Sequence, residues 1–168
     1  MTIPSDDKAD AEFGPPACSM HEADHAYMGY AAKDELTTLS NELLEAEHAG
    51  ARVTRESARA AVSGPIAELM RSIQRDEARW CAMLADHIRA LGEAPTPKVG
   101  AFYGKAMAVA DLGERITFLN RGQAWVVRKL REMLPRVRGD RLHPDLSEML
   151  RSHEANIALA AEVAGHPR

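Results

Sequence analysis

The sequence predicts an all-α protein, a bundle of four helices preceded by an irregular N-terminal arm. Its composition favours helices, because Ala, Leu, Met, Glu and Arg are plentiful and only 5% of the residues are aromatic. Apolar residues recur at helical spacing in four stretches, and no alternating run of Val, Ile and Thr indicates a strand. A chain of 168 residues is long enough to bury one core, so we expect one domain.

Residues 1–33 are expected to form an acidic, partly disordered arm, followed by the bundle domain at residues 34–168. The first half of the arm is acidic and contains several prolines, a composition typical of disorder. Its second half carries apolar residues without a clear period, which indicates irregular packing over the bundle. Cys18 and His21 have the spacing of half a zinc site, but no second pair in the sequence completes it. We therefore expect the arm to cover the bundle or to contact a partner.

Start and stop signals divide the bundle domain into four helices. A Ser-Gly pair ends the first helix, and Pro65 suits the first turn of the second, which stops at Gly92. Pro135 stops the third helix, in which a break near Gly113 is left open, and Pro144 begins the fourth. The expected helices cover residues 34–62, 65–91, 105–134 and 144–164.

The connections between these helices leave the topology open. The link between the first two helices is too short for anything but an antiparallel hairpin. The Pro- and Gly-rich loop at residues 93–103 can stretch roughly 36 Å, whereas a helix of about 27 residues is roughly 40 Å long. A crossover from one end of the bundle to the other is therefore borderline.

The net charge of −4 indicates no particular partner, but the charge is unevenly distributed. Residues 1–34 carry seven acidic and two basic residues, whereas residues 121–141 carry seven basic and two acidic ones. The basic stretch falls at the end of the third expected helix, where the helix dipole favours cations, so we interpret it as a solvated helix end. Binding of an anion or a nucleic acid is the alternative interpretation.

The sequence indicates a cytoplasmic protein without a membrane partner. Two cysteines do not make a disulfide framework, and the N-terminus lacks the pattern of a signal peptide. No apolar run approaches the roughly 20 residues that span a bilayer. A homodimer is left open as the assembly. Neither a Gly-rich phosphate loop nor a nucleophile elbow is present, so no catalytic residue and no small-molecule substrate is assigned.

Each expected helix carries a polar residue inside its apolar stripe, near the middle of the helix. Steps of about 100° per residue place Glu47, Glu77, Asn120 and His153 in these positions. In a bundle of comparable helices, these four residues should share one layer whichever way each helix runs. An isolated buried charge is too costly to keep without partners, so the layer predicts a site.

Further polar residues lie in or beside the same stripes. Gln123 lies inside the stripe of the third helix. Asp76 and His87 lie on the border of the second stripe, from which a slight rotation of the helix would bring them into the site. Glu45 and His48 form a Glu-x-x-His in the linear sequence but point away from the stripe, and we interpret this pair as a surface coincidence.

The predicted layer has the chemistry of a metal site. Two carboxylates and an imidazole that converge in a low-dielectric core are plausible ligands for iron, manganese or zinc. The carbonyl groups of Asn120 and Gln123 could add weak ligands or orient the others. A metal ion would also neutralise the buried negative charge. A hydrogen-bonded layer without metal, which fixes the register of the helices, is the alternative.

With these residues, the chain resembles the ferritin-like superfamily, whose four-helix bundles hold di-iron or di-manganese sites. Those sites take one Glu from each of two helices and a Glu-x-x-His from each of the other two. Glu47 matches a single-Glu position. Glu77 is followed three residues later by Trp80, where the family has a His. The resemblance spans about residues 34–164 and extends to bacterial ferritin-like domain families without an assigned activity.

The third and fourth helices depart from the family pattern. Asn120 stands where a Glu would, and His153 has Leu150 three residues before it instead of a Glu. The resemblance therefore implies a single iron or manganese ion, or a former metal site now held by hydrogen bonds, in place of a full dinuclear centre. Our leading hypothesis is a ferritin-like protein with redox or metal-handling chemistry, with Glu47, Glu77 and His153 as ligands. The rival is a non-enzymatic interaction module whose polar layer is structural.

Overall fold

Four long helices and one short helix make up the described part of the protein. The computed structural model describes residues 29–137 and 141–165, so residues 1–28, with Cys18 and His21, lie outside the described residues. The all-α prediction is confirmed, and no strand occurs within the two described ranges. The elements are α1 (Lys33–Ala61), α2 (Pro65–Ala90), α3 (Phe102–Met107), α4 (Leu112–Met133), the 3-10 helix η2 (Leu134–Arg136) and α5 (Leu142–Gly165).

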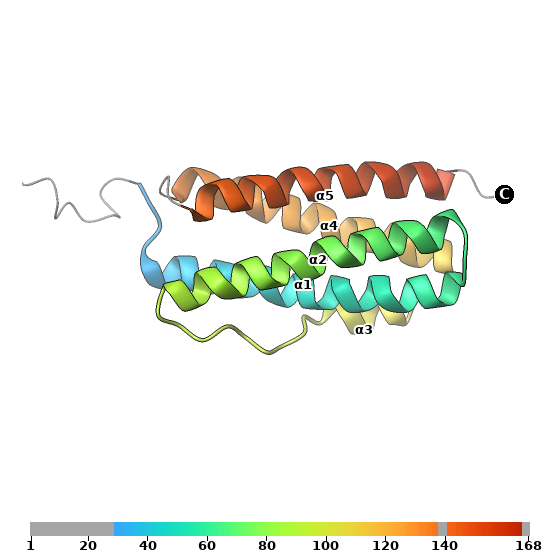
Figure 1. Ribbon diagram of the computed structural model, residues 1–168, viewed down its shortest axis with the longest axis horizontal. Coiled ribbons are helices and arrows are strands. Elements are labelled where there is room, and N and C mark those ends of the chain that lie inside the picture. Colours follow the sequence, from blue (N-terminus) through green and yellow to red (C-terminus); the bar gives the residue numbers. More distant parts are fainter. Residues whose placement is uncertain (1–28, 138–140, 166–168) are drawn as a thin grey trace, which may run out of the picture.

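The four long helices form a square bundle in which neighbouring helices run antiparallel. α1 packs against α2 and α4, and α5 packs against the same two helices, so α1 and α5 lie diagonally opposite each other. The colours in Figure 1 show that α1 and α5 run in one direction and that α2 and α4 run in the other. The topology is therefore two antiparallel hairpins joined by a long crossover between α2 and α4.

The crossover includes α3, which explains why one expected helix is two. The third expected helix, residues 105–134, is interrupted close to the break that the sequence left open near Gly113, since α3 ends at Met107 and α4 begins at Leu112. Asp111 caps α4 by accepting a hydrogen bond of 2.8 Å from the backbone amide of Glu114. Since α3 belongs to the connection, the chain is long enough to pass along the bundle, as Figure 1 shows.

Hydrogen bonds hold the first part of the crossover against α1. The hydroxyl group of Thr96 donates to Glu45 Oε1 at 2.8 Å, and its amide donates to Asn41 Oδ1 at 2.8 Å. Two residues further on, the carbonyl of Lys98 accepts from His48 Nδ1 at 2.9 Å. Glu45 and His48 thus point away from the apolar stripe, as the sequence predicts, and both side chains anchor the crossover.

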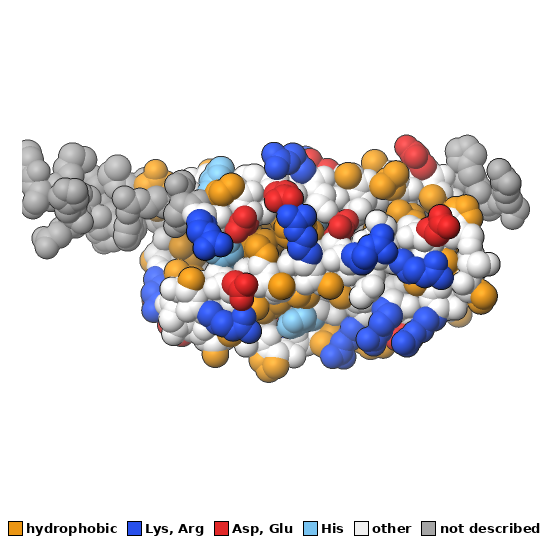
Figure 2. Space-filling view, in the orientation of Figure 1, with side chains coloured by type: hydrophobic (Ala, Val, Ile, Leu, Met, Phe, Trp, Pro, Cys, Tyr) orange, Lys and Arg blue, Asp and Glu red, His pale blue; other side chains and the backbone are white. Residues whose placement is uncertain are grey.

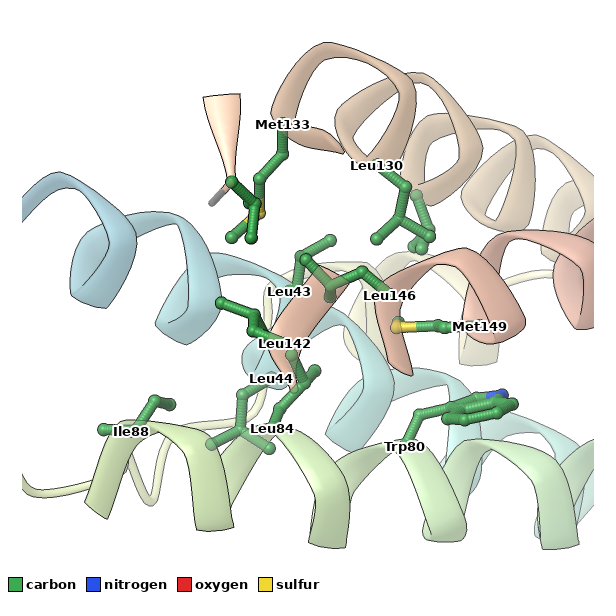
Figure 3. Packing of buried hydrophobic residues seen from close by; sticks show 12 residues of the cluster. Leu43, Leu44, Trp80, Leu84, Ile88, Leu130, Met133, Leu142, Leu146 and Met149 are labelled. Carbon is green, nitrogen blue, oxygen red and sulfur yellow. The ribbon is translucent and has the colours of Figure 1, made fainter. Parts of the chain in front are cut away.

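Two apolar clusters fill the two halves of the bundle. The first half, shown in Figure 3, is packed by side chains that converge from α1, α2, α4 and α5, including Leu43, Leu44, Leu84, Ile88, Leu130, Met133, Leu146 and Met149. The second half is packed by Val53, Leu69, Met70, Ile73, Ala106, Ile116, Leu119 and Ala160. On every long helix, the polar residues of the predicted layer fall between these two clusters.

The turn between α1 and α2 contains a strained residue. Val62 has φ 60° and ψ −60°, the conformation of a tight γ-turn, and the Ser63 amide donates to the Ala61 carbonyl at 2.6 Å. A β-branched residue rarely adopts positive φ. The Val62 side chain is 76% exposed, so no packing offsets this strain.

Charges of both signs cover the outside of the bundle. Figure 2 shows Lys and Arg side chains interspersed with Asp and Glu on one face. Part of the basic stretch at residues 121–141 is paired with acidic residues of other helices, through Lys129 with Glu42 at 3.3 Å and Arg131 with Glu154 at 2.6 Å. No helix in the described part of the chain is long and apolar enough to cross a membrane.

Candidate functional site

One polar side chain from each long helix meets in the middle of the bundle. These are Glu47 of α1, Glu77 of α2, Gln123 of α4 and His153 of α5, and each is 2–3% exposed. The helical spacing in the sequence placed Glu47, Glu77 and His153 in one layer, and the structure also brings these three side chains together. The fourth member of the layer is Gln123, whereas Asn120, expected to share it, lies about one turn away.

Glu47 and His153 join the two diagonally opposite helices through the bundle centre. His153 Nε2 lies 3.1 Å from Glu47 Oε1, and His153 Nδ1 lies 3.0 Å from the carbonyl oxygen of Met149. Because a carbonyl oxygen can only accept, Nδ1 carries a hydrogen. Burial lowers the pKa of His153, but the Glu47 charge and hydrogen bond, the bond to Met149 and the Asp76 charge together raise it above its ordinary value. The imidazolium form of His153 is thus favoured.

Glu77 lies beside this pair, in space that exists because α1 has a glycine at position 50. A Cβ atom added to Gly50 would lie 2.6 Å from Glu77 Oε1, closer than real Cβ contacts. Burial, the Glu47 carboxylate and the Asp76 carboxylate all raise the pKa of Glu77 well above its ordinary value. The neutral form of Glu77 is therefore favoured.

Several buried polar atoms of the layer have no hydrogen-bond partner. They are Glu47 Oε2, Glu77 Oε2, and both the oxygen and the nitrogen of the Gln123 amide. Most buried side-chain polar atoms in proteins are satisfied, because leaving one unpaired costs about 1–3 kcal/mol. Such a concentration of unpaired donors and acceptors in one layer is typical of a site that accommodates a ligand, a metal ion or ordered water.

A cavity of about 530 Å³ connects this layer with the surface between α1, α3 and α4. Its buried end is formed by the four layer residues Glu47, Glu77, Gln123 and His153. Its walls are aromatic and apolar, and include Phe102, Phe118 and Trp125. The exposed residues at its outer end include three cations, Lys105, Arg121 and Arg128.

The structure places the other predicted site residues elsewhere. Asp76 accepts a hydrogen bond from the Asn156 side chain at 3.1 Å and affects Glu77 only through its charge. The Asn120 side chain donates to the carbonyl oxygen of Ile157 at 3.3 Å. His87 contacts Asp145 at 2.7 Å near the end of α2, about ten residues from Glu77. None of these three side chains lines the cavity.

The cavity walls were not predicted from the sequence. Phe102 packs against α4 at Gly122, where an added Cβ atom would lie 2.6 Å from the Phe102 ring. A glycine in the middle of a helix costs about 1 kcal/mol relative to alanine, so Gly50 and Gly122 were the signals of close packing.

The chelating geometry of a metal site is incomplete as the side chains stand. Among the residues that the structure describes, no three His, Cys, Asp or Glu side chains are grouped so that they could hold a metal ion. The nearby Cys81 offers no thiolate, because burial and the charges of Glu47 and Glu77 raise its pKa to about 12. Glu47, Glu77 and His153 could therefore share a metal ion only if the Glu77 carboxyl turned away from Gly50 toward the other two.

Comparison with known proteins gives a family and no activity. The family described as Domain of unknown function (DUF6306) matches residues 34–162, which is the whole bundle up to the last turn of α5. No curated protein and no solved structure matches the chain.

Proposed function

The chain belongs to the DUF6306 family, and we propose that its polar centre binds a single divalent ion of iron or manganese. The ligands would be Glu47, Glu77 and His153, with the Gln123 amide oxygen as a weak further ligand. The observation that carries the proposal is the unpaired oxygen on each buried carboxylate beside an oriented imidazole, at the end of an open cavity.

The orientation of His153 supports the proposal. Metal-binding histidines almost always donate their other ring N–H to a carbonyl or a carboxylate, which fixes the tautomer. His153 donates Nδ1–H to Met149 and directs Nε2 toward Glu47. The distance of 3.1 Å between Nε2 and Glu47 Oε1 is also close to the separation of two neighbouring ligands that each lie about 2.1 Å from an ion.

The charges of the centre also support a cation. Two carboxylates and one imidazole meet in a buried layer, and burial together with the Glu47 and Asp76 charges raises the pKa of Glu77 and favours its protonated form. A bound cation would replace that proton and leave both carboxylates ionised. Completing the ligand set requires the Glu77 carboxylate to turn from Gly50 toward the Glu47–His153 pair.

The topology is consistent with the resemblance noted in the sequence. Ferritin-like bundles are four-helix bundles with one long crossover connection, and they place metal ligands on the inner faces of the helices. In this chain, the ligands would come from α1, α2 and α5, and α4 would supply an amide in place of a carboxylate. When bound, the ion would supply redox or Lewis-acid chemistry at the end of the cavity, and the Phe102 and Trp125 walls would restrict water.

Metal analysis of protein purified without chelator tests the proposal. We expect about one iron or manganese ion per chain in the wild type, and a loss of most of it in both Glu47→Gln and His153→Gln. Glu68→Gln, on an exposed face of α2, and His87→Gln, which removes the contact with Asp145, are matched controls that should keep the metal. Equal metal content in all five proteins, or no binding of added Mn²⁺ or Fe²⁺ by the wild type, would sink the proposal.

A structural polar layer in a non-enzymatic interaction module is the second candidate. It is favoured by the hydrogen bonds that already join α5 to α1 through Glu47 and to α2 through Asp76, without any ligand. It predicts that Glu77→Gln keeps or raises the free energy of unfolding in protein that has never contained metal, since an amide avoids the cost of keeping this buried carboxyl either charged or protonated. A metal-dependent increase in stability that Glu77→Gln abolishes would exclude this candidate.

A further inference from the structure

The cavity above the polar centre has an arrangement of charge that the proposed metal site does not use. Its exposed end is lined by Lys105, Arg121 and Arg128. Within the described part of the chain, the side chains of these three cations have no recorded ion pair or hydrogen bond. The outer end of the cavity therefore carries unneutralised positive charge.

The acidic residues of the cavity lining do not cancel this charge. Glu42 forms an ion pair with Lys129 at 3.3 Å. Glu45 accepts the hydrogen bond of Thr96 at 2.8 Å and keeps its charge, but the three cations outnumber this single carboxylate. Glu47 and Glu77 lie at the opposite, buried end. The cavity is thus basic where it meets solvent and carries hydrogen-bonding groups at its buried end.

Flat hydrophobic side chains lie between the two ends. Phe102 and Phe118 stack with ring centroids 5.0 Å apart and planes inclined by 10°, and Trp125 lies on the same cavity wall. Aromatic walls of this kind favour a flat apolar body by stacking and by burial of its surface.

The buried end offers a built hydrogen-bonding position. Gln123 is 3% exposed, lines the cavity, and has neither its amide oxygen nor its amide nitrogen bonded to another described group. A hydroxyl group can donate to the oxygen and accept from the nitrogen of an amide. Because an unpaired buried amide is costly, a ligand that satisfies it gains specificity.

We infer that the cavity binds a small organic anion: a carboxylate held by Arg121 and Arg128, a flat apolar body against Phe102 and Trp125, and a hydroxyl group at Gln123. This inference rests on the proposed function only in that such a molecule would be the substrate presented to the ion. Binding of the anion by Arg121, Arg128 and Gln123 requires no metal, so the two claims can fail separately.

Isothermal titration calorimetry with defined probes tests the inference, first on metal-free full-length protein and then on the same protein with Mn²⁺. The probe is 3-(4-hydroxyphenyl)propionate. Its neutral counterpart, 3-(4-hydroxyphenyl)propan-1-ol, has the same body without the carboxylate, and 3-phenylpropionate lacks only the hydroxyl group. We expect saturable binding of the hydroxy acid, with Kd roughly tenfold or more below that of the alcohol, because charge-assisted hydrogen bonds to arginine are strong.

Variants then locate the binding. Arg121→Ala combined with Arg128→Ala should raise Kd of the acid roughly tenfold or more, whereas Arg52→Ala with Arg75→Ala, two exposed arginines outside the cavity, should change it little. Gln123→Leu should bring the hydroxy acid to the affinity of 3-phenylpropionate. This variant should fold, since replacing an unpaired amide by an apolar group of similar size is close to neutral.

Each outcome decides one claim. Equal affinity for acid and alcohol, an equal effect of the control pair, no effect of Gln123→Leu, or no saturable binding at millimolar probe with or without Mn²⁺ would overturn the inference. Binding of the acid to protein that takes up no metal would leave the inference standing and remove the metal site. Metal uptake without any binding of the acid would leave the metal site standing and overturn the inference.

Discussion

Replacing Gly50 by alanine tests whether Glu77 lies where the structure places it. Gly50 is buried within α1, and an added Cβ atom would lie 2.6 Å from both Glu77 Oε1 and Glu77 Cδ. A contact this short requires the Glu77 side chain to move. Glu77 lines the cavity, so its carboxyl group would have to turn away from Gly50 into that space.

Two opposing effects set the size of the change. Alanine is favoured over glycine within a helix by about 1 kcal/mol, whereas inserting a methyl group into a packed core typically costs 1–3 kcal/mol. We therefore expect Gly50→Ala to lower the free energy of unfolding of metal-free protein by up to about 2 kcal/mol. In a Glu77→Ala background the space is open, and the same substitution should raise it by about 1 kcal/mol.

Urea titration of the four proteins of this cycle measures the coupling, expected at about 1–3 kcal/mol with unchanged m-values. Gly104→Ala is the control, because Gly104 lies in α3 with nothing within 4 Å of an added Cβ atom. Its effect should be the same in both backgrounds. A gain of about 1 kcal/mol from Gly50→Ala in the wild type, equal to the gain in Glu77→Ala, would refute the packing of Glu77 against Gly50.

Three further predictions concern pH, the first turn and the crossover. Because the pKa of Glu77 is raised, the folded state keeps this proton above pH ~4.5, where the unfolded chain loses it. Metal-free protein should therefore lose stability as pH rises, by up to about 1.4 kcal/mol per pH unit. The raised pKa of His153 changes stability in the same direction above the pKa of the unfolded chain. Urea midpoints from pH 5 to pH 8 should fall less steeply in Glu77→Gln, and parallel profiles would contradict this. Val62→Gly should raise the free energy of unfolding by about 1 kcal/mol, because glycine adopts φ 60° without strain; a loss of stability would argue against the γ-turn. Glu45→Ala should speed amide hydrogen exchange around Thr96 while leaving metal content unchanged, and loss of metal would contradict the structural role of Glu45.

The parts of the fold that local signals determine were predictable from the sequence. α1 and α2 match the expected helices to within one residue at each end, because a Ser-Gly pair, Pro65 and Gly92 mark their limits. A break in the third expected helix was left open near Gly113, and the structure places it between Met107 and Leu112. The signal was present in Asp111, three residues before Glu114, which is a helix-start pattern.

Three members of the layer were predictable from the sequence, but its fourth member and its surroundings were not. Helical spacing identifies the buried face of α4, and both Asn120 and Gln123 lie on it. Which of the two reaches the centre depends on how α4 slides along its neighbours, and that is set by contacts such as Phe102 against Gly122. The cavity depends on the same long-range packing of α3, which no local pattern encodes. Glu45 and His48 acquired their role in the same way, from a crossover whose path the sequence left open.

The most direct measurement of the central claim is anomalous diffraction from crystals of the full-length protein grown with Mn²⁺, recorded to locate the metal. The account predicts one strong peak between Glu47, Glu77 and His153, within about 2.2 Å of His153 Nε2 and of a carboxylate oxygen, and its disappearance in His153→Gln. The absence of a peak at this position in wild-type crystals, or a peak only near Cys18 and His21, would contradict it.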